Sequence, residues 1–143
     1  MQTVLDLPFN QFIGLQPAEA PHLLSLPAGG QYLNHLGTVH ASALLALAEA
    51  SSGEWLLQNL KGMEGIIPVV RRMESKFRKP AGGGVRSTVS MKPEEIVTLK
   101  HTLDTKGRAL IEILVELHDD SGQHVLSATV EWFITRAADS SIS

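Results

Sequence analysis

Residues 34–60 read NHLGTVHASALLALAEASSGEWLLQNL, and they predict the central element of the fold. From Ala41 to Leu47 almost every side chain is apolar or very small. A segment that is apolar on all sides is typical of a helix buried inside a protein. Glu49 lies within this segment, and an unpaired buried carboxylate is so costly that such groups are neutralised, paired or used in function. Glu49 is therefore the first candidate for a functional residue.

The residues around this segment indicate its boundaries. Three polar side chains collect just before it, around Gly37: Asn34, His35 and His40. We expect the helix to begin near Thr38 or Val39 and to end near Lys61-Gly62, where a glycine favours a C-terminal stop. Polar groups therefore meet at one end of an apolar helix.

The composition excludes several classes of protein. The 143 residues suit one domain, predicted to span residues 1–143 with a polar tail at 137–143. The net charge of −3 includes no large basic block, which argues against a nucleic-acid partner. The chain has no cysteine, so disulfides, thiolate catalysis and cysteine-based zinc sites are excluded. The histidines supply no convincing three-ligand set, so we expect neither a metal nor a cofactor.

The sequence also argues against membrane contact. The first twelve residues, MQTVLDLPFNQF, lack the basic start and the long apolar run of a signal peptide. No stretch approaches the roughly 18 uninterrupted apolar residues of a membrane span. We therefore expect a cytoplasmic protein with no membrane partner.

The rest of the chain is rich in strand patterns. Long strands are expected at 66–79, 85–91, 109–117 and 126–134, and two weaker ones at 14–16 and 22–26. A short helix is expected from Pro93 to the stop at Gly107. Because helices do not alternate with strands, a doubly wound parallel sheet is disfavoured. We predict an α+β fold in which a curved antiparallel sheet wraps around one long central helix.

Two motifs carry a resemblance to a known family. The first is an Asn, a Gly, a His followed by small residues, and an acid nine positions after the His: Asn34, Gly37, His40-Ala41-Ser42 and Glu49. The second is Phe77-Arg78-Lys79-Pro80-Ala81, at the end of a strand. Together they resemble the hotdog-fold acyl-CoA thioesterases of the phenylacetate-pathway type. That family often has His-Gly-Gly in the first motif, and its acid is commonly Asp, whereas Glu occurs in a related branch.

The resemblance covers roughly residues 30–136 and implies a hotdog fold and hydrolysis of an acyl-CoA or related acyl thioester. By this resemblance, the Ala41 N–H would hold the oxyanion, His40 would shape the turn, and Glu49 would act as general base or nucleophile. Asn34 would orient the water or the carboxylate. In this family the active site forms between two subunits, so Asn34 and Glu49 can come from different chains.

Cations follow along the strand at 66–79 and are candidates for contacts with coenzyme A phosphates: Arg72, Lys76, Arg78 and Lys79. On strict strand alternation, Arg72, Lys76 and Arg78 share one side. Arg71 and Lys79 share the other side, so at most one of these sets lines a single surface.

Each candidate also has a purely structural interpretation. Glu49 could be satisfied by a structural hydrogen bond, His40 could cap the helix, and Asn34 could only form a turn. The cations could be a solvated strand face.

Two other functions remain open at this point. A hotdog dehydratase or hydratase could use His35 with Glu49 on an acyl thioester, and a non-catalytic member of the fold could bind acyl-CoA without turnover. In each case we expect a homodimer that can pair into a homotetramer. One small sheet around one helix leaves strand edges and apolar surface exposed, and pairing removes both.

Overall fold

The computed structural model describes residues 2–137, so the predicted polar tail lies, from residue 138 on, outside the described residues. One six-stranded antiparallel sheet has the strand order β1-β2-β4-β5-β6-β3. Its strands are β1 (Gln16–Pro17), β2 (Leu24–Leu26), β3 (Ile66–Phe77), β4 (Val85–Ser90), β5 (Arg108–Asp119) and β6 (His124–Arg136). The helices are η1 (Val4–Asp6), α1 (Pro8–Ile13), η2 (Gly30–Tyr32), α2 (Ala41–Asn59) and α3 (Pro93–Lys106).

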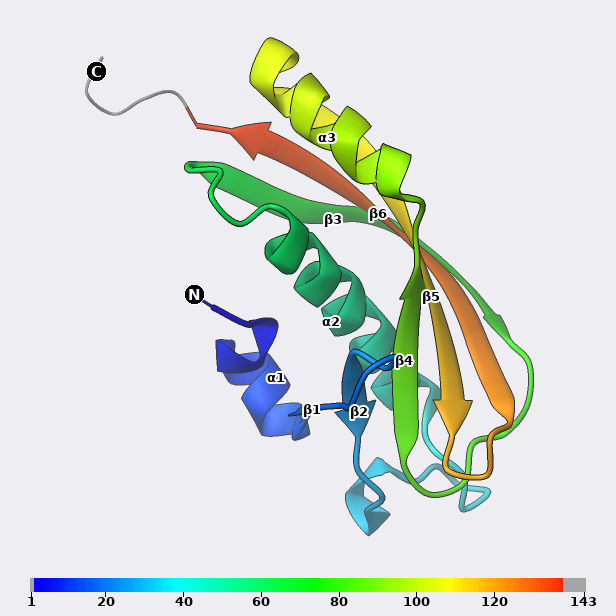
Figure 1. The fold of residues 1–143 in the computed structure, drawn as a ribbon. Helices are drawn as coiled ribbons and strands as arrows, with labels where there is room; N and C mark the ends of the chain where they lie inside the picture. Colours follow the sequence, from blue (N-terminus) through cyan, green and yellow to red (C-terminus); the bar gives the residue numbers. More distant parts are fainter. Residues whose placement is uncertain (1, 138–143) are drawn as a thin grey trace.

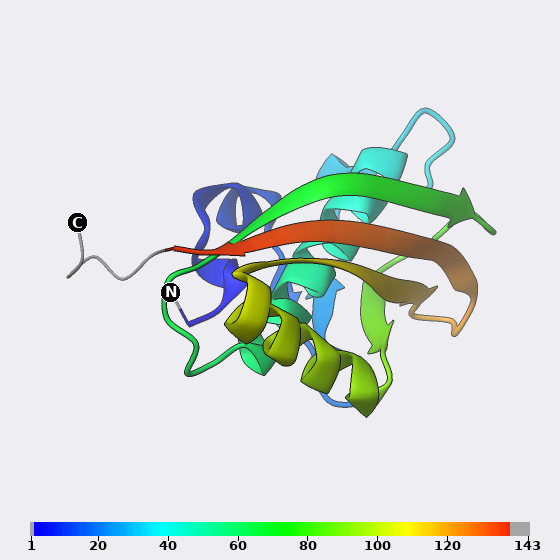
Figure 2. The same cartoon turned by 90° about the horizontal axis from the view of Figure 1, so that it is seen from above.

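The sheet curves around α2, as the sequence pattern predicted (Figure 1). Helix α2 packs against β2, β4, β5 and β6, and the N-terminal elements η1 and α1 contact α2 from another side. Helix α3 packs against β5 and β6 near one end of the sheet (Figure 2). The predicted α+β architecture is confirmed.

Strand alternation builds the core. Every second residue of β5 from Ile111 to Leu117 is buried, and so is every second residue of β6 from Leu126 to Ile134. These side chains point towards α2, whose Leu47 and Ala48 are fully buried. Because successive strand residues face opposite sides, the residues between them lie on the outer, convex face of the sheet.

Helix α2 begins later than predicted. The backbone N–H of Val39 donates to the Ala81 carbonyl over 3.0 Å, and that of His40 donates to the Tyr32 carbonyl over 2.7 Å. These bonds keep both residues extended, so the first helical residue is Ala41 rather than 38 or 39. The helix ends at Asn59, two to three residues before the predicted glycine stop. Within residues 2–137, no helix is both long and apolar enough to cross a membrane.

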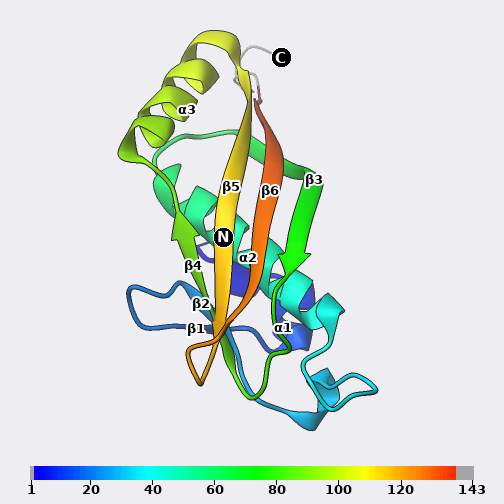
Figure 3. The ribbon, with the colours of Figure 1, turned by 90° about the vertical axis from the view of Figure 1, so that its right-hand side faces the viewer.

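Strand β3 forms one edge of the sheet and pairs only with β6 (Figure 3). It ends at Phe77 instead of at residue 79, and most of its side chains are exposed. The register with β6 shifts between Val70 and Arg72, which marks a bulge at Arg71. A long exposed edge is a ready template for pairing with another strand.

Candidate functional site

Glu49 lies half-buried on α2, in a stripe of the helix that the rest of the chain does not fully cover. Its neighbours one turn away on the helix, the partly covered Leu45 and Ala46 and the buried Gly53, carry no charge. Within the described residues, its carboxylate accepts no hydrogen bond and forms no ion pair. Desolvation by burial raises the pKa of Glu49 above its ordinary value. The structure therefore holds an acid without a partner on an apolar helix.

The first turn of α2 keeps one backbone donor free. The Ser42 N–H donates to the Nδ1 atom of His40 over 3.0 Å, so His40 caps the helix with its ring. The N–H groups of Ala43 and Leu44 donate to the His40 carbonyl over 3.0 and 3.2 Å. In the described chain the N–H of Ala41, an exposed residue, donates to no protein acceptor. This donor also lies at the positive end of the helix dipole, which favours an anion there.

The free amide and the free acid are far apart within one chain. Glu49 follows Ala41 by eight residues, which corresponds to about 12 Å along the helix axis. Although helical side chains lean towards the N-terminus, this separation is too long for both groups to contact one carbonyl and its attacking water directly. Both groups face the same broad side of α2, because residues eight positions apart in a helix point in directions about 80° apart around its axis.

Asn34 shapes the loop that leads into α2. Its Oδ1 atom accepts from the backbone N–H of Leu36 over 2.9 Å and of Thr38 over 3.1 Å, and its amide donates to Thr38 Oγ1 over 2.9 Å. Gly37 in this loop has a φ of 77°, a conformation that favours glycine. His35 is exposed in the same loop. No hydrogen bond among the described residues joins Asn34 or His35 to Glu49 of the same chain.

Three of the predicted cations, Arg72, Lys76 and Arg78, lie together on the convex face of the sheet. Arg72 lies opposite Glu131 and Lys76 lies opposite Ser127, and these two residues of β6 alternate with buried ones. The bulge at Arg71 moves that residue out of strict alternation, and its Nε atom lies 3.7 Å from a Glu131 oxygen. Arg72 is paired with Glu74, whereas Lys76 and Lys79 form no ion pair within residues 2–137.

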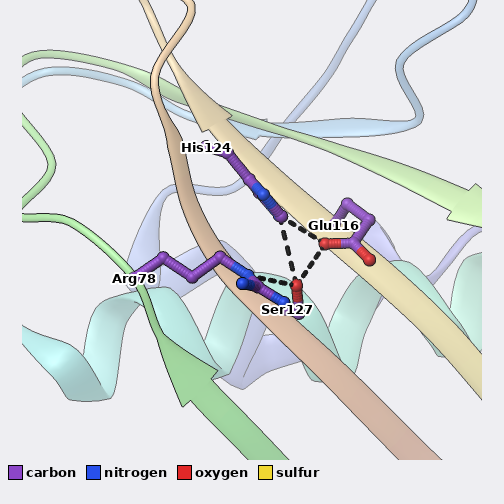
Figure 4. A network of polar contacts seen from close by, with 4 residues as sticks. All are labelled: Arg78, Glu116, His124 and Ser127. Atoms are coloured by element: carbon purple, nitrogen blue, oxygen red, sulfur yellow. Dashed lines mark hydrogen bonds and ion pairs between the residues drawn. The ribbon is translucent and has the colours of Figure 1, made fainter.

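The third cation, Arg78, belongs to a polar network that ties the end of β3 to the β5–β6 hairpin (Figure 4). Its Nε atom donates to Ser127 Oγ over 2.8 Å, and that hydroxyl donates to the Glu116 carboxylate over 2.5 Å. The same carboxylate contacts His124 Nε2. A single ring nitrogen meets both the acid and the hydroxyl, so this set is not a Ser-His-acid catalytic triad, in which the acid and the hydroxyl use opposite ring nitrogens.

Sequence reasoning missed a second acid on α2. Glu54 is only 5% exposed, and its carboxylate accepts from Thr3 Oγ1 over 2.6 Å and from the Val4 N–H over 3.1 Å. Five residues separate it from Glu49, which puts the two acids about 140° apart around the helix. The apolar neighbours Trp55 and Leu56 were a signal of its burial, but its partners lie fifty residues earlier in the chain.

The other buried acid, Asp119 at the end of β5, organises the loops near the start of α2. Its carboxylate accepts from the hydroxyl and N–H of Ser121, from the N–H and side-chain amide of Gln123, and from the Gly82 N–H. Burial by itself would raise the pKa of Asp119, but these hydrogen bonds outweigh it and lower the pKa to about 2. Asp119 is therefore ionised and fully used in structure.

Comparison with known proteins identifies the family. A family model described as a domain of unknown function, DUF4442, matches residues 13–134. The chain belongs to the DUF4442 family. Among curated proteins, none matches it.

Solved structures show which fold this family member has. PA5026 from Pseudomonas aeruginosa, described as a protein of unknown function and a "Probable Thioesterase", is 26% identical, with a TM-score of 0.76 over 94% of this chain and 91% of that one. Thioesterase HI1161 from Haemophilus influenzae is 11% identical, with a TM-score of 0.67 over 96% and 89%. BH2602 from Bacillus halodurans, solved with CoA, is 21% identical, with a TM-score of 0.60 over 78% and 65%. This DUF4442 protein has the hotdog fold, as the two sequence motifs predicted.

Proposed function

We propose that this DUF4442 protein hydrolyses an acyl thioester, with the Glu49 carboxylate as general base or nucleophile. The observation that carries the proposal is the state of Glu49: half-buried, without a partner in the described chain, and with a raised pKa. An acid whose pKa is shifted by burial and that has no structural partner is a candidate for a functional site. The similarity to PA5026 and the CoA in the BH2602 structure support an acyl-CoA substrate.

The chemistry follows from the two unused groups of α2. The Ala41 N–H would donate to the thioester oxygen as negative charge develops there. The Glu49 carboxylate would take a proton from a water whose oxygen forms a bond to the carbonyl carbon, or would itself attack that carbon. On the first route the carbon–sulfur bond then breaks, and the leaving thiolate takes up the proton that Glu49 accepted from water. On the second route the thiolate leaves as the acyl group forms an anhydride with Glu49, and water then hydrolyses that anhydride, which frees Glu49 and supplies the proton for the thiolate. His40 would keep the first turn in place through its bond to the Ser42 N–H.

Because about 12 Å along the helix separate Ala41 from Glu49, we propose that each site uses Ala41 of one copy and Glu49 of another. Two copies would pair along the exposed edge strand β3, giving a homodimer that could assemble further into a homotetramer. Asn34 of one copy would then reach the water or the carboxylate of the other. In its own chain it fixes the loop before Ala41.

The cations of β3 would hold the phosphates of coenzyme A. Lys76 and Lys79, which form no ion pair in the described chain, are the stronger candidates, with Arg72 and Arg78 beside them. Replacing Lys76 with alanine should raise KM for an acyl-CoA about threefold, the effect of one exposed charge contact. The KM for the same acyl group on N-acetylcysteamine, which has no phosphate, should not change. Equal effects on both thioesters would contradict this assignment.

The proposed function is tested by thiol release from a panel of acyl-CoAs. The wild-type protein should cleave at least one of them, and Glu49→Gln should lower kcat/KM by at least 100-fold while the circular dichroism spectrum stays unchanged. Robust cleavage by Glu49→Gln would remove Glu49 from the mechanism. Stoichiometric binding of acyl-CoA with no cleavage of any thioester would replace the proposal with a binding function.

A further inference from the structure

A second feature of α2 lies beyond Glu49, towards the end of the helix. A cavity of about 590 Å³ opens between the N-terminal segment, the last turns of α2, the loop after it and the start of β3. The side chains that line it are almost all apolar, and they include Val4, Leu56, Leu60, Met63, Ile66 and Trp132. We call it the Trp132 cavity. Lys61 contributes the single charged side chain to its lining.

The Trp132 cavity continues the stripe of α2 that carries Glu49. Gly53, which lines the cavity, follows Glu49 by four residues and therefore lies on the same face, about 6 Å further along the axis. The absence of a side chain at Gly53 lets two walls approach the helix closely. A Cβ atom there would lie 3.4 Å from Trp132 Cζ2 and 3.4 Å from Val4 Cγ1.

Hydrogen bonds hold two walls of the cavity in place. The buried Glu54 carboxylate binds the Val4 N–H, and Asn10 Nδ2 donates to the Val4 carbonyl over 2.9 Å. The Trp132 Nε1–H donates to Ser52 Oγ over 2.9 Å, so the indole presents its apolar ring to the cavity. Two parts of the lining are therefore anchored, and the cavity offers an occupant apolar side chains rather than hydrogen-bonding ones.

We infer that the Trp132 cavity receives the acyl chain of the substrate, and that this chain is aliphatic and of medium or greater length. The inference rests on the proposed function and adds the substrate class. A cavity of about 150 Å³ holds a benzene ring, so this one has room for much more than a single phenyl ring. A flexible chain that starts at a carbonyl beside Glu49 would run past Gly53 into it. Trp132, Met63 and the N-terminal segment would set the chain length.

The test measures kcat/KM for saturated acyl-CoAs from acetyl to palmitoyl. Once the chain reaches the cavity, kcat/KM should rise about threefold to fourfold per added methylene and then level off when the cavity is full. Met63→Trp should put a bulky ring into the cavity, shorten the path open to the chain and lower the dodecanoyl-to-acetyl ratio of kcat/KM at least tenfold. Val97→Trp introduces the same side chain at an exposed site on α3, outside the cavity, and should leave that ratio at the wild-type value.

A second variant covers the case in which Met63→Trp does not fold. Gly53→Ala adds one methyl group at the entrance, and alanine is the better helix former of the two. It should lower the same ratio about threefold, the effect of one lost methylene contact. A ratio that neither variant changes would overturn the inference.

Calorimetric binding of dodecanoic acid separates this inference from the proposed function. Wild-type protein should bind it, and Met63→Trp should weaken binding at least tenfold. If no thioester is cleaved but this result is found, the proposed hydrolysis fails and the cavity assignment stands. If thioesters are cleaved with no preference for longer chains and dodecanoic acid does not bind, the cavity assignment fails and hydrolysis stands.

Discussion

Two acids lie five residues apart on α2, and they have opposite surroundings. Glu54 is buried and bonded to the hydroxyl of Thr3 and the amide of Val4. Glu49 is half-buried and has no partner in the described chain, and its pKa is raised by desolvation. One helix therefore carries an acid that fastens the N-terminal segment and another that no donor of the described chain engages. The difference shows that burial alone does not distinguish an acid used in structure from a candidate for catalysis, because the two acids differ in their hydrogen-bond partners.

The largest effect is expected from removing the donor that we pair with Glu49. Ala41→Pro deletes the free N–H, and proline is well tolerated at the first helical position. The preceding residue, His40, has φ −63° and ψ 140°, which a following proline allows. Thioester kcat/KM should fall about 10²–10³-fold, the usual effect of losing one oxyanion donor. An unchanged rate in a folded Ala41→Pro protein would exclude the Ala41 amide from the site.

The pH dependence of the reaction tests the ionisation of Glu49. As general base or nucleophile, Glu49 must be ionised, and desolvation raises its pKa. The rate should therefore fall tenfold per pH unit below that raised pKa, so the acid limb should lie at a higher pH than for an ordinary glutamate. The kcat/KM of the wild-type protein measured across the acid range checks this. A limb at or below the ordinary glutamate pKa would contradict the assignment.

The comparison predicts a different outcome for Glu54→Gln. The amide keeps the shape of the side chain but weakens the bonds to Thr3 and Val4, so unfolding free energy should drop by about 1–3 kcal/mol. The kcat/KM for acetyl-CoA per folded molecule should stay within about twofold of wild type, because Glu54 faces away from Glu49. Urea unfolding with the assay on the same sample measures both. Loss of the reaction without loss of stability would reverse the roles of the two acids.

The smallest effect is a stability gain in Glu49→Gln. The pKa of Glu49 is raised in the folded state, so on increasing pH the carboxyl group ionises in the unfolded chain before it does so in the folded protein. The wild-type fold therefore loses stability as pH rises from the ordinary glutamate pKa to the raised pKa. Glutamine does not ionise, so the variant has no buried charge to stabilise. Its unfolding free energy should match that of wild type below the ordinary glutamate pKa and exceed it at neutral pH. Urea midpoints at about pH 4 and about pH 8 measure the difference. A variant less stable than wild type at the higher pH would indicate a structural partner for Glu49.

The sequence predicts those parts of the fold that repeat along the chain. The all-apolar run around Leu47 predicts α2, and the alternation through Ile113 and Val130 predicts the two central strands with the correct buried faces. Such patterns are local, and each residue adds evidence for the same element. The motif from Asn34 to Glu49 predicts the hotdog fold.

Features set by distant parts of the chain could not be predicted. The start of α2 depends on bonds from Val39 and His40 to Ala81 and Tyr32, and the role of Glu54 depends on Val4. The bulge at Arg71 depends on the register with β6, which no single-strand pattern contains. For the candidate site, residue types could be read from the sequence. The lack of a hydrogen-bond partner for the Ala41 amide and for Glu49 could not be read from it, because that depends on the positions of all neighbouring donors and acceptors in the fold.

Mixing two inactive variants tests most directly whether each site combines Ala41 of one copy with Glu49 of another. Ala41→Pro lacks the amide and Glu49→Gln lacks the acid, so a dimer containing one copy of each has one site with both groups intact if the site is shared. After unfolding and refolding an equal mixture, thioester cleavage should return to about a quarter of the wild-type rate, because half the dimers are mixed and each has one working site of two. Each variant refolded alone should remain inactive. A mixture that stays as inactive as its components would contradict a site built from Ala41 of one copy and Glu49 of another.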